Sequence, residues 1–125
     1  MERNLFTKSE RLYLKKDIEN LFAKGKSFLS FPLRIFYLQR TCNETDGGVS
    51  VLVSVPKKRI RQAVNRNRIK RLVRESYRLN KNRLSGQHLH IGFIYIDNEV
   101  KPYSDIEKSI RRAFEMIEKN NTLKT

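Results

Sequence analysis

The sequence KKRIRQAVNRNRIKRLVRESYR, residues 57–78, decides how the rest of this chain is interpreted. It contains ten lysines and arginines and a single acid, Glu75, and therefore carries a charge of +9 out of the chain's net +14. The other 103 residues hold 17 basic and 12 acidic side chains, which nearly balance. Charge that served solubility alone would be spread along the chain, so this concentration indicates a polyanionic partner.

From Ala63 onward, a helical rotation of about 100° per residue sorts this segment into two faces. One face carries Ile69, Leu72, Val73 and Ser76, with Asn65 and Leu79 at its margins. The opposite face carries Asn67, Lys70, Arg71, Arg74 and Arg78, flanked by Arg66 and Arg68. The first face is wide enough to dock on a sheet, which leaves the second to present guanidinium groups to phosphates. A solvated helix face is the simpler interpretation, but like charges at i,i+3 and i,i+4 repel, which favours an anionic ligand.

Residues 63–75, AVNRNRIKRLVRE, preceded by Lys57 and Lys58, closely resemble the RNR signature of the bacterial ribonuclease P protein subunit. The resemblance extends to the length, the charge and the order of elements, and it spans most of residues 8–120. The three residues 66–68 alone would be a weak match. The full signature, placed after a valine-rich strand in a chain this small, is a strong one.

The length of 125 residues predicts a single RNA-binding domain over residues 1–125, with one modest core. No apolar run reaches the length of a membrane span and residues 1–10 lack the apolar region of a signal peptide, so we expect a cytoplasmic chain. An anionic membrane is a poorer partner than nucleic acid, because the apolar helix face is needed to cover strands. Cys42 is the only cysteine and is interpreted as an incidental thiol rather than a nucleophile.

The first half of the chain is expected to contain an arm, a helix and two strands. Residues 1–14 form a basic arm laid on the domain, and residues 17–23 form a short helix that ends at Gly25. Residues 28–40 form a strand interrupted at Pro32, and residues 49–55 alternate valine with serine and leucine as a half-buried strand. Residues 43–48 between them have the composition of a turn.

The second half is expected to contain two long helices around one strand. The basic helix follows Pro56 and runs to about Leu84, and residues 89–96 are apolar on both faces, which predicts a central strand. The sequence Ser-Asp-Ile-Glu at 104–107 has the form of a capping box and opens a last helix. The tail, residues 121–125, is expected to fray.

The resulting order is α-β-β-α-β-α, with an additional strand near Phe28 if Pro32 divides the first one. Helices that cover one face of the sheet give an α+β fold, a two-layer α/β sandwich. The ribonuclease P protein subunits share this order as αβββαβα, with a central, mostly antiparallel sheet. Their βαβ crossover around the basic helix is left-handed, whereas the general rule predicts a right-handed one, and we follow the family.

The sequence offers no active site of its own. Its acids are scattered over turns and helix starts, where each is explained as a cap or a partner of the helix dipole. There is no glycine-rich phosphate loop. His88 and His90 point to one face of a strand, and a metal or general-base role for them is the alternative to ordinary strand-edge histidines. We therefore predict no catalytic residue and no metal site in the protein.

The resemblance accounts for this gap, because in ribonuclease P the RNA subunit is the catalyst. That RNA uses Mg²⁺ to hydrolyse the bond that frees the 5′ leader of precursor tRNA, while the protein supports the RNA fold and reads the leader. The resemblance thus implies a one-to-one complex with the catalytic RNA, contact with precursor tRNA, no membrane, and no cofactor on the protein alone. Carried onto this sequence, the resemblance implies that the residues in contact with the catalytic RNA are Arg66, Asn67, Arg68, Lys70, Arg71 and Arg74, and Arg78 extends the same face. The residues implied to bind nearby phosphates are Lys57, Lys58, Arg59 and Arg61.

The resemblance also implies that the leader runs in a cleft between the first helix and one sheet face. The residues of this cleft are Ile18, Phe22, Phe36, Ser50, Leu52 and Ser54. Phe22 and Phe36 can stack on bases, which is sequence-tolerant, but packing in the core is an equally good interpretation of both. Ile18 stands where many family members have an aromatic side chain, so stacking is lost there.

Two other functions are open on the residues alone. The first is a structural RNA-binding protein of the ribosomal type, with the same basic helix and no role in processing. The second is a protein-only ribonuclease that uses His88 or His90. Excess positive charge can also leave the isolated chain partly unfolded until anions bind.

Overall fold

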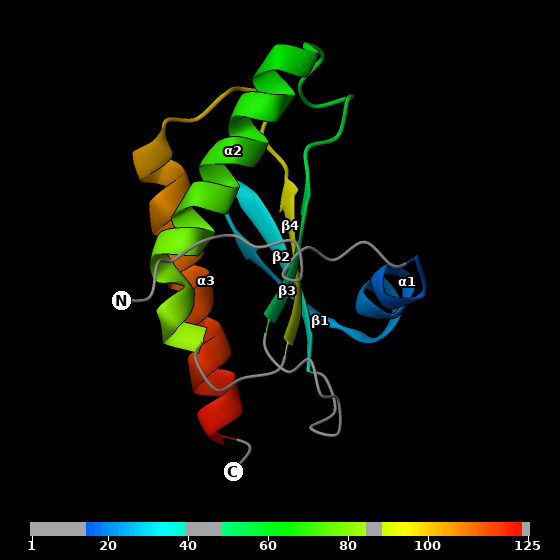
Figure 1. Ribbon diagram of the computed structural model, residues 1–125, viewed down its shortest axis with the longest axis vertical. Helices are drawn as coiled ribbons and strands as arrows, with labels where there is room; N and C mark the ends of the chain where they lie inside the picture. Colours follow the sequence, from blue (N-terminus) through cyan, green and yellow to red (C-terminus); the bar gives the residue numbers. More distant parts are fainter. Residues whose placement is uncertain (1–14, 40–48, 85–88, 124–125) are drawn as a thin grey trace, which may run out of the picture.

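A computed structural model describes residues 15–39, 49–84 and 89–123 of the chain (Figure 1). The elements in chain order are α1 (Lys15–Lys24), β1 (Lys26–Ser30), β2 (Leu33–Gln39), β3 (Val49–Ser54), α2 (Ala63–Asn80), the 3₁₀ turn η2 (Lys81–Leu84), β4 (Leu89–Tyr95) and α3 (Tyr103–Leu123). This is the expected αβββαβα order, and the cis peptide between Phe31 and Pro32 divides the first strand region as anticipated. The expected arm at 1–14, the turn at 43–48, Cys42 and His88 lie outside the described residues.

The four strands form one mixed sheet in the order β1-β2-β4-β3. β2 is antiparallel to both of its neighbours, and β3 is parallel to β4, so the sheet is mostly antiparallel and β4 is a central strand, as expected. α2 connects the parallel pair β3 and β4. The left-handed sense of this crossover stays a prediction from the resemblance. The basic helix is thereby held against the sheet between its two adjacent strands.

α2 and α3 cover one face of the sheet and enclose the core (Figure 1). The sheet contributes alternate residues of β2, which are buried as the pattern predicts because side chains one residue apart point to opposite faces. α2 contributes Ile69, Val73 and Tyr77, and α3 contributes Ile106 and Phe114. Each fully buried side chain of this size stabilises the fold by about 1.5–3 kcal/mol. The helix layer and the sheet together form the expected two-layer sandwich.

α1 is the exception to the expectation that all helices cover one face, because it packs on the other side of the sheet, against β2 and β4 (Figure 1). Leu21 is completely buried there. The contact depends on Gly92, since a Cβ at that position would lie only 3.1 Å from Leu21 Cδ2. Gly25 ends the helix as predicted, and its amide donates to the carbonyl of Leu21 at 2.9 Å.

Three helix ends differ from the sequence expectation. The capping box is wrong, because α3 already begins at Tyr103 and Ser104 lies inside it; the Pro102 carbonyl accepts from the amides of Asp105 and Ile106 at 3.1 and 3.3 Å. The basic helix becomes 3₁₀ after Asn80, whose side chain donates to the Ser76 carbonyl at 2.8 Å. α3 also extends to Leu123, past the point where we expected the tail to start. Within the described ranges, no helix is long and apolar enough to cross a membrane.

Candidate nucleic-acid interface

The outward face of α2 consists of Arg66, Asn67, Arg68, Lys70, Arg71, Arg74 and Arg78. Asn67, Arg68 and Arg71 are exposed, and the other members are partly exposed. They point away from the core because Ile69 and Val73, which alternate with them along the helix, are completely buried. The helix therefore orients this face by packing its other side, which is the arrangement that the sequence predicts. Tyr77 is a core residue of α2 that the sequence reasoning missed, although it follows Val73 at i,i+4.

Arg66 on this face is held by the backbone of the connection that precedes the helix. Its Nη1 atom donates to the carbonyl of Ile60 at 3.0 Å and to that of Arg61 at 2.7 Å. The guanidinium group thus braces the connection between β3 and α2. Arg66, which the sequence assigns to RNA contact, therefore also has a structural role.

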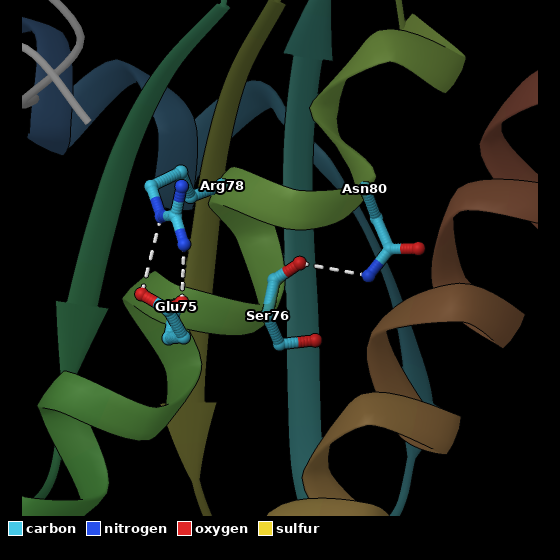
Figure 2. Close-up of polar contacts among 4 residues, drawn as sticks. All are labelled: Glu75, Ser76, Arg78 and Asn80. Atoms are coloured by element: carbon cyan, nitrogen blue, oxygen red, sulfur yellow. Dashed lines mark hydrogen bonds and ion pairs between the residues drawn. The ribbon is translucent and has the colours of Figure 1, made fainter. Parts of the chain in front are cut away.

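Arg78 at the other end of the face is paired with Glu75 (Figure 2). Its Nε donates to Oε2 of Glu75 at 3.1 Å, and its Nη2 forms a second, shorter contact with Oε1. The hydrogen bonds from Arg78 lower the pKa of Glu75, so the carboxylate stays charged below its usual range. The single acid of the basic helix is therefore hydrogen-bonded to the cation at the C-terminal end of the face.

The connection between β3 and α2, residues 56–62, gathers the four cations predicted to hold phosphates. The Pro56 carbonyl accepts from the amides of Arg59 and Ile60 at 3.0 and 3.2 Å, which closes a turn with Lys57 and Lys58 exposed. A polar pocket lies beside it, lined by Lys58, Arg59, Ile60, Arg61, Gln62, Asn65 and Asn98. The first turn of α2 has no acid, so the positive end of the helix dipole adds to these cations.

Asn98 is a residue of this pocket that the sequence reasoning missed. Its Oδ1 accepts from Arg59 Nη1 at 3.4 Å and ties the connection to the loop after β4. Asn65, expected at the margin of the apolar helix face, instead donates from Nδ2 to Gln62 Oε1 at 2.9 Å. No sequence signal links residues 59 and 98, because only the sheet order brings them together.

The open face of the sheet is the side opposite the core, and the strand register arranges it in rows. One row runs Ser50, His90, Leu38; the next runs Leu52, Gly92, Phe36, Ser27; and the third runs Ser54, Ile94, Arg34, Leu29. Ser50, Leu52, Ser54 and Phe36 are all partly exposed. The sequence-predicted residues of β2 and β3 therefore share one accessible surface.

α1 brings the remaining predicted residues to this face. The rings of Phe22 and Phe36 meet edge to face with their centroids 4.8 Å apart. Phe22 keeps 40% of its surface exposed and Phe36 is partly exposed, so neither is part of the buried core that was their alternative interpretation. Ile18 lies one helical turn before Phe22 and is also partly exposed. An aromatic pair flanked by accessible strand residues can stack on unpaired bases.

Metal-ligating side chains do not cluster in the described part of the chain. Within residues 15–39, 49–84 and 89–123, no three histidine, cysteine, aspartate or glutamate side chains gather as a metal site would require. His90 is 8% exposed on β4 and makes a contact within the chain, which does not suit a free general base. That the protein binds no cofactor stays a prediction.

Comparison with known proteins gives a consistent result. A family model described as Ribonuclease P matches residues 6–118. The ribonuclease P protein component of Porphyromonas gingivalis is 42% identical over 114 residues, which cover 86% of this chain and 82% of that protein. That of Clostridium botulinum is 33% identical over 104 residues, which cover 82% of this chain and 89% of that protein.

Solved structures of similar proteins share the fold. The RNase P protein of Staphylococcus aureus matches with a TM-score of 0.71 at 23% identity, over 86% of this chain and 94% of that one. The RNase P protein of Thermotoga maritima matches with a TM-score of 0.72 at 22% identity, over 86% of this chain and 96% of that one. At these identities the structural likeness concerns the fold alone.

Proposed function

This chain belongs to the family of ribonuclease P protein components, and on that premise we propose that the outward face of α2 binds the catalytic RNA of ribonuclease P. The open face of the sheet would bind the 5′ leader of precursor tRNA. The observation that carries the proposal is the outward face itself, which presents exposed Arg68 and Arg71 from a helix fixed by its buried side. Hydrolysis, with its Mg²⁺, is assigned to the RNA.

Contact with the catalytic RNA would rest on charge and on the geometry of guanidinium groups. Arginine donates two parallel hydrogen bonds to a phosphate and can do so from a rigid helix without reorganisation. The connection at residues 56–62 would add Lys57 and Lys58 next to the N-terminus of α2, where partial positive charge favours phosphates. Binding of this kind releases counterions, so it should weaken steeply with added salt.

Contact with the leader would rest on stacking. Phe22 and Phe36 offer ring surface that every base can use, so the protein would tolerate many leader sequences. The serines of β3 can donate to phosphate or ribose oxygens beside the rings. The first turn of α1 contributes Ile18, which can make apolar contact but cannot stack. The two surfaces lie on opposite sides of the sheet, so one chain could hold both RNAs at once.

Reconstitution with a ribonuclease P RNA tests the proposal. The purified chain should restore cleavage of precursor tRNA at low Mg²⁺, where the RNA alone is slow, and should bind precursor tRNA more tightly than mature tRNA. A chain that binds the RNA without aiding cleavage would be a structural RNA-binding protein instead. Cleavage by the chain without RNA, abolished by His88→Ala, would establish a protein-only ribonuclease and displace the proposal.

A further inference from the structure

The third row of the open face contains an arginine that neither the core nor the sheet edge explains. Arg34 lies on β2 between Leu33 and Ile35, which are completely buried, so its side chain belongs to the open face. Its neighbours in the row are Ile94 on β4 and Leu29 on β1. Charged residues commonly protect exposed sheet edges, but β2 is an interior strand with a partner on each side. A protective role at an edge therefore does not apply.

The surroundings of Arg34 suit a nucleotide. Arg34 is exposed, and the ion pairs found in the described part of the chain do not include it. Leu29 beside it is 61% exposed, and Ile94 is partly exposed, so α1 leaves this row accessible to a ligand. A guanidinium group next to exposed apolar side chains can bind a phosphate while the apolar groups cover a ribose or base edge.

The position of Arg34 relative to the aromatic pair suggests how a single strand would run along this surface. Arg34 and Phe36 are two residues apart on the same face of β2, which separates their Cα atoms by about 6.8 Å. One nucleotide of an extended single strand spans a comparable length. A strand lying along β2 with one base on Phe36 would therefore bring the adjacent phosphate to Arg34.

We propose that Arg34 binds a leader phosphate one nucleotide away from the base that contacts Phe36, and thereby extends the leader-binding surface to the Leu29 end of the sheet. This inference rests on the proposed function. It makes the contribution of Arg34 dependent on leader length, because a leader that stops short of this row cannot contact it. A solvated arginine without a ligand would show no such dependence.

The test uses the complete ribonucleoprotein and precursor tRNAs whose leaders are lengthened one nucleotide at a time. Arg34→Ala should bind short-leader substrates like the unmodified enzyme, and should bind longer ones about fivefold more weakly once the leader reaches the row. Arg34→Lys should recover part of the loss, because it keeps the charge but not the fork. Arg112→Ala is the matched control, since Arg112 is an exposed arginine on α3 in the opposite layer.

The outcomes separate this inference from the function on which it rests. Equal affinity of Arg34→Ala and the unmodified enzyme at every leader length would overturn the inference alone. An equal loss at every length, mature tRNA included, or an equal loss in Arg112→Ala, would also overturn it, because the effect would then be general charge. If the unmodified protein gives no gain in affinity with leader length, the proposed leader contact itself fails.

Discussion

The outward face of α2 and the open face of the sheet lie on opposite sides of the molecule and differ in chemistry (Figure 1). The first presents guanidinium and ammonium groups from one helix, with Glu75 as its single acid. The second presents an aromatic pair, serines and Arg34 from several elements. The first suits the phosphates of a folded RNA and the second suits unpaired nucleotides. Salt should therefore affect the first contact strongly and the second weakly, and substitutions should separate the two.

The sharpest separation should come from Gly25→Ala, which acts on one side of the sheet only. A Cβ at Gly25 would lie 2.3 Å from the Leu21 carbonyl oxygen and 2.9 Å from that of Tyr37, and backbone atoms cannot move aside as a side chain would. We expect a loss of about 3 kcal/mol in the free energy of unfolding and a displaced α1. Leader-dependent affinity should fall, while affinity for the catalytic RNA, measured in the same titrations, should persist.

Gly92→Ala is the matched control for that substitution, because its new Cβ would meet only the Leu21 Cδ2 methyl, at 3.1 Å. A side-chain end can shift by a few tenths of an ångström, so Gly92→Ala should affect stability and leader binding less than Gly25→Ala does. If Gly25→Ala instead weakened catalytic-RNA binding as much as leader binding, the two surfaces would not be independent.

Arg71→Ala should produce the largest loss on the α2 side. Arg71 is exposed in the middle of the outward face, and the carboxylate of Glu75, one helical turn further on, is hydrogen-bonded to Arg78. Loss of a charge-assisted phosphate contact should cost about 1–3 kcal/mol in affinity for the catalytic RNA, if the contact excludes water. The dependence of log affinity on log salt should flatten by about one ion. Affinity measured over a potassium chloride series checks both effects, with Arg112→Ala as the control for net charge.

Phe36→Ala should have a comparable or smaller effect, and on the leader alone. A base stacked on this ring would contribute about 1–2 kcal/mol to precursor affinity, and the loss should hardly change with salt. Phe36→Tyr keeps the ring and should retain most of the affinity. A loss that also appears with mature tRNA, which has no leader, would contradict the assignment of Phe36 to the leader.

The sequence predicts the fold well where one local pattern decides the structure. The alternation along β2 and the helical spacing of Ile69 and Val73 fix which sides are buried, and both expectations are confirmed. It does not place α1, because Leu21 packs beside Gly92 on β4, some 70 residues away in the sequence. Nor does it reveal that Ser30 on β1 donates from Oγ to the Ser109 carbonyl on α3 at 2.8 Å, since nothing local marks either serine.

The candidate site shows the same division. Helical periodicity predicts which cations of α2 lie on the face away from the core, and the structure has them on that face. Which of them contact the chain does not follow: Arg66 and Arg68 look equivalent in the sequence, yet Arg66 reaches two carbonyls of the preceding connection. That difference arises from the path of residues 60–61, which no local pattern encodes. The row that joins Arg34 to Ile94 and Leu29 likewise needs the strand register, which a sequence alone leaves open.

The smallest expected effect is a gain in RNA affinity, and it concerns Glu75, the acid beside the outward face. Glu75→Gln removes the negative charge that faces Arg78, so affinity for the catalytic RNA should rise by less than about threefold. Glu115→Gln adds the same charge on α3, where Glu115 pairs with Arg83 at 3.8 Å, and should leave affinity nearly unchanged.

The pH dependence sharpens the role of the Glu75–Arg78 pair. Because the pKa of Glu75 is lowered in the folded chain, mainly by hydrogen bonds from Arg78, the stability due to the pair is present above the usual carboxylate range. It is lost as pH falls through the lowered pKa, and Glu75→Gln should lack that acid-side change in thermal unfolding. If Glu75→Gln weakened RNA binding instead, then Glu75 would serve mainly to orient Arg78, and the C-terminal end of the outward face would depend on geometry more than on net charge.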